Sequence, residues 1–136
     1  MNNVFMQAAI NEAKKAFKKG EVPIGAVIVK NNKIIAKTHN LVEIKNNALC
    51  HAEIIAIKKA SKKLKNWRLS DCDLYVTLEP CDMCTGAIKN ARINKVYYAT
   101  KKNQENSKKQ DDYVCLNNYT VQCLELIQTF FKNRRG

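Results

Sequence analysis

The sequence lacks a long apolar run. No stretch of its 136 residues approaches the ~20 consecutive apolar residues that a membrane-spanning helix needs. The opening residues, MNNVFMQAAINEAKK, also lack the basic segment followed by an apolar one that marks a secretory signal. Neither an internal repeat nor a Gly/Ser-rich linker divides the chain. These absences predict a single domain over residues 1–136, no membrane association and a cytoplasmic protein.

Acidic residues are scarce relative to basic ones. The chain has 12 Asp and Glu against 24 Lys and Arg, which gives a formal net charge of +12. Such a balance favours a polyanionic partner, and nucleic acid is the first candidate. Most of the basic residues are lysines, however, and an AT-rich genome raises the lysine content through its codons. Part of the charge is therefore expected to be ordinary solvated surface.

Cysteine, by contrast, is abundant, with six residues. An even number of cysteines suits a disulfide framework in a secreted protein. Without an export signal, reduced thiols or metal ligands are favoured instead. Two of the six form the motif described below. The other four are expected to be small buried hydrophobic residues, and they are Cys50, Cys72, Cys115 and Cys123.

Hydrophobic periodicity predicts helices alternating with strands. Amphipathic patterns predict helices over residues 3–19, 51–65, 81–91 and 121–135. Short runs rich in β-branched residues predict strands over residues 24–30, 33–39, 73–79 and 95–100. The first two strands read as a hairpin with an Asn-Asn turn, residues 101–112 as a charged loop, and residues 113–120 fit no pattern. The order predicts a mixed sheet covered by helices.

Cys81 and Cys84 form a C-x-x-C pair at a predicted helix start, directly after Pro80. Residues three apart lie on one helical face, so both sulfurs can bind one ion. The helix N-terminus lowers thiol pKa values and favours the thiolate form that binds metals. Taken alone, the pair also fits a redox motif or half of a zinc knuckle. No second C-x-x-C pair exists in the sequence, which disfavours a four-cysteine structural zinc site.

His51 and Glu53 open the second predicted helix and complete the pattern. One histidine and two cysteines give zinc three protein ligands and leave the fourth position open, as in catalytic sites. Glu53 can stand beside that position and take a proton from zinc-bound water, whose pKa falls from 15.7 to roughly 7. Singly, His51 fits a core histidine and Glu53 an acid that complements the helix dipole. Together with the cysteine pair, they predict one catalytic zinc per subunit. Cys50 as a fourth ligand is disfavoured, because adjacent side chains diverge.

These residues match a known signature. HAE followed by PCDMC is the H-x-E…P-C-x-x-C pattern of zinc nucleobase deaminases. With EVPIGAVIV, NWRLSDCDLYVTLEPCDMCTGAI and the terminal FFKNRR, the chain resembles the cytidine/deoxycytidylate deaminase superfamily, and within it the bacterial tRNA-specific adenosine deaminases. The resemblance implies a three-layer α/β/α cytidine-deaminase-like fold with a mixed sheet of about five strands, and a homodimer. It also implies zinc-dependent hydrolytic conversion of the wobble adenosine of a tRNA anticodon to inosine.

The resemblance also implies roles for individual residues. Glu53 would shuttle protons, and the zinc ligands would be His51, Cys81 and Cys84. Contacts to the target nucleotide and its base pocket would come from Asn40, Glu21, Val22, Pro23 and Ile24. The net charge adds expected phosphate contacts to the anticodon arm, from Lys101, Lys102, Lys132, Arg134 and Arg135.

The region after residue 100 departs from the family pattern. The tRNA enzymes usually carry an arginine–aspartate pair and a glycine-rich basic loop there, whereas this chain has ATKKNQENSKK, with Lys102 where the acid is expected. The stretch before the last helix is also shorter than usual. A free-base or nucleoside deaminase acting on guanine, cytosine or cytidine therefore stays open as an alternative. A non-catalytic zinc-bound RNA-binding module is disfavoured, because it has no use for the proton shuttle Glu53.

Overall fold

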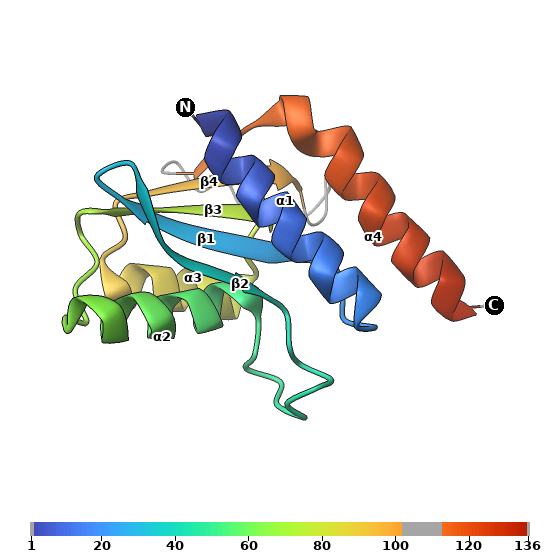
Figure 1. Cartoon of the computed structure of the whole chain (residues 1–136), viewed down its shortest axis with the longest axis horizontal. Helices are drawn as coiled ribbons and strands as arrows, with labels where there is room; N and C mark the ends of the chain where they lie inside the picture. The colour runs from blue at the N-terminus through green and yellow to red at the C-terminus, as the bar shows by residue number, and fades with distance from the viewer. Residues whose placement is uncertain (1, 102–112, 136) are drawn as a thin grey trace.

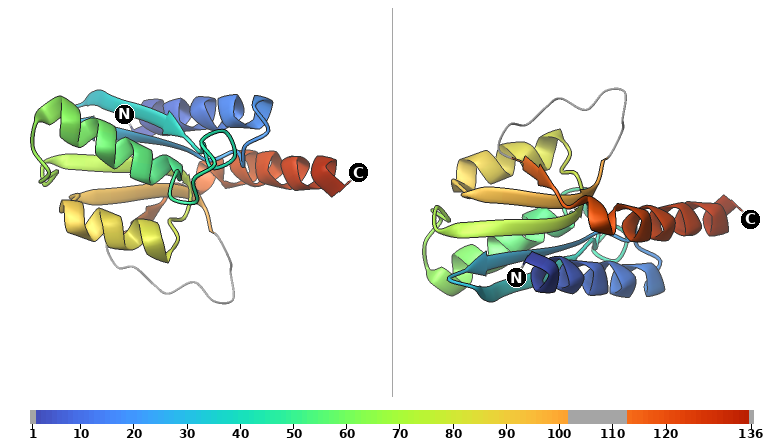
Figure 2. Two further views of the ribbon diagram at one scale, coloured as in Figure 1. Left: turned by 90° about the horizontal axis from the view of Figure 1, so that it is seen from below. Right: turned by 90° about the horizontal axis from the view of Figure 1, so that it is seen from above.

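The computed structural model describes residues 2–101 and 113–135, and within them a sheet lies between two layers of helices (Figures 1 and 2). The helices are α1 (Asn2–Lys18), α2 (Ala52–Leu64), α3 (Asp82–Ala91) and α4 (Thr120–Arg135), with a 3-10 turn at Asn117–Tyr119. The strands are β1 (Gly25–Lys30), β2 (Lys33–His39), β3 (Cys72–Leu78), β4 (Lys95–Thr100) and β5 (Tyr113–Cys115). None of these helices is long and apolar enough to cross a membrane.

The sheet is mixed, as the sequence predicts. Its five strands lie in the order β2-β1-β3-β4-β5; β1 runs antiparallel to both of its neighbours, and β3, β4 and β5 are parallel. Asn31 and Asn32 join β1 to β2 with positive φ angles of 51° and 62°. Two consecutive left-handed residues make the tight hairpin turn that asparagine tolerates best after glycine. The expected Asn-Asn hairpin is therefore confirmed.

Helices α1 and α4 cover one face of the sheet (Figure 2). The core on this side joins Met6 and Ile10 of α1 to Val27 and Tyr75 of the sheet. α1 approaches β1 so closely that a Cβ atom on Gly25 would lie 1.9 Å from the carbonyl oxygen of Ala9. Only glycine fits at this position, and it fixes α1 against the start of β1.

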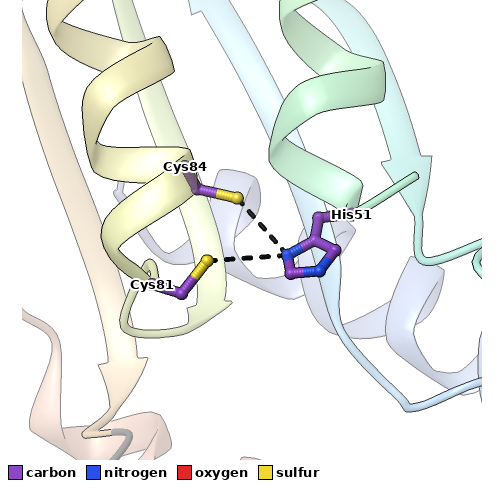
Figure 3. Close-up of side chains that lie close together, drawn as sticks. All are labelled: His51, Cys81 and Cys84. Carbon is purple, nitrogen blue, oxygen red and sulfur yellow. Dashed lines mark hydrogen bonds between the residues drawn. The ribbon is translucent and has the colours of Figure 1, made fainter. Parts of the chain in front are cut away.

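Helices α2 and α3 cover the opposite face (Figure 1). Ala52, Ala56 and Ala60 are fully buried at four-residue spacing, so α2 lies close to the sheet without large side chains between them. β3 leads directly into the start of α3, next to the start of α2 (Figure 3). The three-layer arrangement is thus confirmed, and it places the amino ends of two helices side by side at one edge of the sheet.

The four cysteines outside the motif do not behave alike. Cys72 and Cys123 are buried, as expected, with 1% and 2% of their surface exposed. Cys50 is half-buried and Cys115 is exposed, so the expectation is wrong for Cys115 and only partly met by Cys50. Cys115 lies on β5, a three-residue strand at the edge of the sheet, where less of the chain covers it. All six thiols are free of disulfides.

Candidate metal centre and active site

Three metal-binding side chains meet where α2 and α3 begin (Figure 3). His51 and Cys81 are the residues immediately before the two helices, and Cys84 lies in the first turn of α3. The Nδ1 atom of His51 lies 3.7 Å from the Sγ atom of Cys81 and 3.5 Å from that of Cys84. The three side-chain atoms all lie within 4.8 Å of one another.

This geometry fits a tetrahedral zinc ion. Zinc bonds of ~2.3 Å to sulfur and ~2.1 Å to nitrogen put neighbouring ligand atoms about 3.6 Å apart. The two nitrogen–sulfur distances, 3.5 and 3.7 Å, bracket that value. Within residues 2–101 and 113–135, the group contains these three residues and not Cys50. Three protein ligands leave one zinc position for another molecule.

The electrostatics of the group suit a cation. Burial lowers the pKa of His51, which favours the neutral imidazole that binds metals. Burial, and then the nearby Glu53 carboxylate, raise the pKa of the Cys84 thiol far above its usual range. A cation in the group lowers the pKa of this thiol, against the burial and the carboxylate that raise it, and so stabilises the thiolate. Neither His51 nor Cys81 caps its own helix through its side chain, so both side chains stay available to an ion.

Glu53 lies beside the three ligands but outside their group. It occupies the first turn of α2 with only 4% of its surface exposed. Burial raises its pKa to about 7, although hydrogen bonds from its own backbone N–H and from Cys84 act in the opposite direction. A carboxyl group that titrates near neutrality can both accept and donate a proton. The local chemistry is therefore that of a proton carrier next to a metal-binding group.

Asn40 ties the end of β2 to the start of α2. Its side chain is buried, and its Oδ1 atom accepts a hydrogen bond of 2.8 Å from the N–H of Ala52. The hydroxyl of Thr38 donates to the carbonyl of the same Ala52. The backbone N–H of Asn40 donates to the carbonyl of Ile24 at 3.1 Å. These bonds hold Asn40 against Ala52, the residue that lies between His51 and Glu53 in the chain.

The segment 21–24 joins α1 to β1 next to Asn40. Pro23 and Glu21 are buried, whereas Val22 and Ile24 are half-buried. Glu21 has both carboxylate oxygens engaged by backbone N–H groups of the loop between β2 and α2. The sequence did not predict this contact, because its partners lie more than twenty residues away.

The sequence also did not predict a buried pair, Glu12 and His39, that two exposed lysines contact. Nδ1 of His39 donates to Glu12 at 2.9 Å, and Lys15 donates to the other oxygen of Glu12 at 2.8 Å. Lys19 lies 3.1 Å from Nε2 of His39 and can only donate, so Nε2 accepts. Burial acts to raise the pKa of Glu12, but the bonds from Lys15 and His39 outweigh it and lower the pKa from its ordinary value. These contacts join α1 to His39, the residue before Asn40. The one sequence signal for them was an acid, Glu12, among the apolar residues of the predicted helix 3–19.

The expected RNA-contacting residues lie at two places. Lys101 is exposed and directly follows β4. Its neighbour Thr100 accepts a hydrogen bond from the N–H of Glu79, so the end of β4 lies close to the start of the cysteine motif. Lys132 and Arg134 are exposed on α4, with the Arg134 guanidinium 5.2 Å from the ring centre of Phe130. The side chains of the other two expected residues cannot be placed in the same way. Lys102 falls outside the described residues, and only the backbone of Arg135 is described.

Comparison with known proteins points to one family. A family model described as MafB19-like deaminase matches residues 2–135. The tRNA-specific adenosine deaminase of Streptococcus pyogenes serotype M18 is 44% identical, with 96% of this chain and 90% of that protein covered. The protein of the same description from Bacillus subtilis is 53% identical over 71% of this chain, which spans 60% of that relative's length.

Solved structures of similar fold are also deaminases. A structure from a study of A-to-I editing by tRNA:A34 deaminases at the wobble position of transfer RNA superposes with a TM-score of 0.84 at 35% identity, covering 91% of this chain and 99% of that one. Guanine deaminase from Bacillus subtilis superposes with a TM-score of 0.71 at 43% identity, covering 74% of this chain and 65% of that one.

The three-layer fold and the His-Cys-Cys group beside a buried glutamate define the deaminase class. The chain belongs to the deaminase family that includes the bacterial tRNA-specific adenosine deaminases. The family resemblance inferred from HAE and PCDMC is thereby confirmed, and so is the fold that it implied.

Proposed function

We propose that the chain is a zinc-dependent tRNA adenosine deaminase that converts the wobble adenosine of an anticodon to inosine. One observation carries the proposal: His51, Cys81 and Cys84 meet within 4.8 Å beside the buried Glu53. The Streptococcus pyogenes relative, 44% identical over almost the whole chain, supports tRNA as the substrate. A cytoplasmic location and a single domain over residues 1–136 belong to the same proposal.

Each residue at the helix starts has a role in this reaction. His51, Cys81 and Cys84 would hold one zinc ion per subunit. Zinc, when bound, supplies Lewis acidity that makes water a nucleophile at neutral pH. Glu53 accepts a proton from the attacking water and delivers it to the adjacent ring nitrogen of adenine. It then takes the second proton of the same oxygen and carries it to the amino group, which leaves carbon 6 as ammonia while the oxygen stays on the ring as a carbonyl.

Asn40 and the segment 21–24 would hold the target base. The target adenine must leave the stack to reach the zinc site, and anticodon bases are largely single-stranded, so the cost is small. Asn40 is held in place by its bond to Ala52, one residue after the zinc ligand His51. Val22, Pro23 and Ile24 bring apolar surface to the same junction through the bond between Ile24 and Asn40.

A free-base deaminase is the second candidate. The superposition with guanine deaminase from Bacillus subtilis, at 43% identity, favours it. Parallel incubation of the purified protein with an adenosine-bearing anticodon stem-loop, guanine and cytidine separates the candidates. We expect inosine from the stem-loop; xanthine or uridine as the main product would replace the tRNA assignment with the small-molecule one.

RNA binding should depend strongly on salt. Each phosphate neutralised on a single strand contributes a slope of about −0.7 in log affinity against log salt. Lys132→Ala combined with Arg134→Ala should therefore weaken all stem-loops alike and flatten the slope by about 1.4, measured by fluorescence anisotropy in a salt series. Lys62→Ala with Lys63→Ala, which removes two exposed charges from the far end of α2, is the matched control and should leave the slope unchanged. Equal slopes for the two variants would exclude α4 from RNA binding.

We also propose a homodimer, with the outer surface of α3 in the interface. This surface carries Met83, Ala87 and Gly86, and a Cβ atom built on Gly86 meets nothing within 4 Å. Gly86 and Ala87 let a second subunit approach closely, and Met83 adds apolar surface. Sedimentation velocity at micromolar concentration should give a species of about twice the 15.5 kDa chain mass. A single monomeric species under these conditions would refute the dimer.

A further inference from the structure

The loop between β2 and α2, residues 41–49 and here called the rim loop, is bounded by two residues of the candidate site. Asn40 precedes it, and His51 follows it after Cys50. The N–H of Leu41 donates to the carbonyl of Cys50 at 3.0 Å and closes the loop at its base. The loop projects from the body of the protein next to the start of α2 (Figure 1). Its conformation is thus coupled to the site at both ends.

Several hydrogen bonds within the rim loop shape its turns. Lys45 donates to the carbonyl of Leu41 at 2.9 Å, and Asn47 donates to that of Val42 at 3.0 Å. The backbone N–H groups of Glu43 and Ile44 point instead toward the protein, where the carboxylate of Glu21 accepts both, at 3.1 and 2.7 Å. These two bonds tie the middle of the loop to a buried side chain of another segment.

The environment of Glu21 makes this anchor strong. Only 1% of its surface is exposed. In the part of the chain that the structure describes, no lysine or arginine forms an ion pair with Glu21. Its two carboxylate oxygens are thus satisfied by the two loop N–H groups, and hydrogen bonds to a charged acceptor are about twice as strong as neutral ones. A buried carboxylate held in this way binds the loop backbone at a defined place.

The anchored loop presents apolar surface to solvent. Ile44 is 53% exposed and Leu49 is 58% exposed. Both lie within eight residues of His51 along the chain. Bases that have left the stack pack against aromatic and apolar side chains of the enzymes that hold them. On a basic protein that acts on one flipped nucleotide, the neighbouring nucleotides of the same strand are the ligands that this surface fits.

We propose that Glu21 is a positioning residue that holds the rim loop so that Ile44 and Leu49 pack against the nucleotides flanking the target adenosine. This inference rests on the proposed function. It assigns Glu21 to the loop backbone, whereas the family resemblance places it in the base pocket. Glu21 acts through the loop and contributes to binding of the RNA strand, whereas the chemical step depends on Glu53.

Glu21→Gln tests the anchor. Glutamine has the same size, but its NH₂ group cannot accept a hydrogen bond, so one of the two loop N–H groups loses its acceptor. We expect the amide exchange of Glu43 and Ile44 to rise roughly 10- to 100-fold. The KM for an anticodon stem-loop should rise about tenfold while kcat changes less than about twofold. Each protein is measured at the same interval below its own melting temperature, which removes differences in global stability.

Glu12→Gln is the matched control. Glu12 is also a buried carboxylate with two hydrogen-bond donors, but it lies on α1 and contacts Lys15 and His39 rather than the rim loop. It should leave the amide exchange of Glu43 and Ile44 near its wild-type value. Unchanged exchange in Glu21→Gln, or the same rise in both variants, would overturn the anchor.

Ile44→Ser with Leu49→Ser tests the contact separately. This variant should raise the KM for the stem-loop about tenfold without changing the amide exchange of the loop backbone. An unchanged KM would overturn the contact with flanking nucleotides. A wild-type protein that deaminates guanine but not the stem-loop defeats the proposed function and the RNA role of the loop together. The exchange experiment still decides whether Glu21 anchors the loop in that case.

Discussion

Glu53→Gln is expected to abolish deamination while the protein stays folded. Glutamine fills the same buried space at the start of α2 but cannot accept a proton from water or release one to the substrate. General acid–base catalysis contributes roughly 10²- to 10⁴-fold, and here one carboxylate serves two proton transfers. The loss in kcat should therefore reach at least the upper part of that range. Inosine formation from an anticodon stem-loop, followed by chromatography of the digested RNA, measures it.

Two further measurements make this result specific to proton transfer. Zinc content and melting temperature should match those of the wild-type protein, because Glu53 lies outside the ligand group. Affinity for the stem-loop should also be retained, since Glu53 contacts only the reacting base. Residual turnover within about tenfold of wild type would remove Glu53 from the chemistry and leave the metal site without a proton carrier.

The parts of the fold that the sequence predicts are those fixed by local patterns. The four long helices and the first four strands follow from periodicity, and the Asn31–Asn32 turn follows from a residue type that tolerates positive φ. β5 was not predicted, because a three-residue strand has too few positions for alternation to show. Its pairing with β4 is a property of the sheet and has no signal in residues 113–115 alone.

The candidate site shows the same division between local and distant information. The spacing of Cys81 and Cys84 places two sulfurs on one helical face, a purely local prediction. That His51, thirty residues earlier, reaches the same point depends on β3 leading back beside α2. The ligand chemistry of one histidine and two cysteines, together with the family signature, made this predictable. The bond of Glu21 to Glu43 in the rim loop spans 22 positions, and that of Glu12 to His39 spans 27. No sequence signature marks either bond.

These unpredicted contacts share one function in the fold. Both join the segment around α1 to the region where β2 ends, next to Asn40. Helix α1 carries none of the metal ligands, yet Glu12 fixes the strand end and Glu21 fixes the loop that follows. The metal-binding group is thus built from the α2 and α3 side of the sheet, and its surroundings are held from the α1 side. Sequence motifs identify the first set of residues because chemistry restricts their types, and packing alone determines the second.

Cys84→Ser is expected to remove zinc from the protein. The wild-type chain should contain one zinc ion after gel filtration, because three side chains able to bind it lie at distances that fit a tetrahedral ion. Serine offers a hydroxyl in place of the buried thiolate nearest to His51, and a neutral hydroxyl is a poor zinc ligand. Zinc content should fall well below one per chain and deamination should be lost with it. Elemental analysis of the purified variants measures the metal directly.

Two cysteine controls show whether the site is open or closed. Cys115→Ser changes an exposed thiol at the sheet edge and should retain one zinc ion. Cys50→Ser should also retain it, because Cys50 lies outside the ligand group; loss of zinc in this variant would mean that Cys50 completes a closed structural site. A wild-type protein without zinc would defeat the metal assignment entirely.

Removal of zinc should also lower stability in a way that depends on the ligands. A ligand present at a thousandfold excess over its dissociation constant stabilises the folded state by about 4 kcal/mol. A strong chelator should therefore lower the melting temperature of the wild-type protein and of Cys115→Ser. It should leave that of Cys84→Ser unchanged, because this variant has no bound zinc to lose. An equal effect of chelator on all three proteins would place the stabilising metal elsewhere than at His51, Cys81 and Cys84.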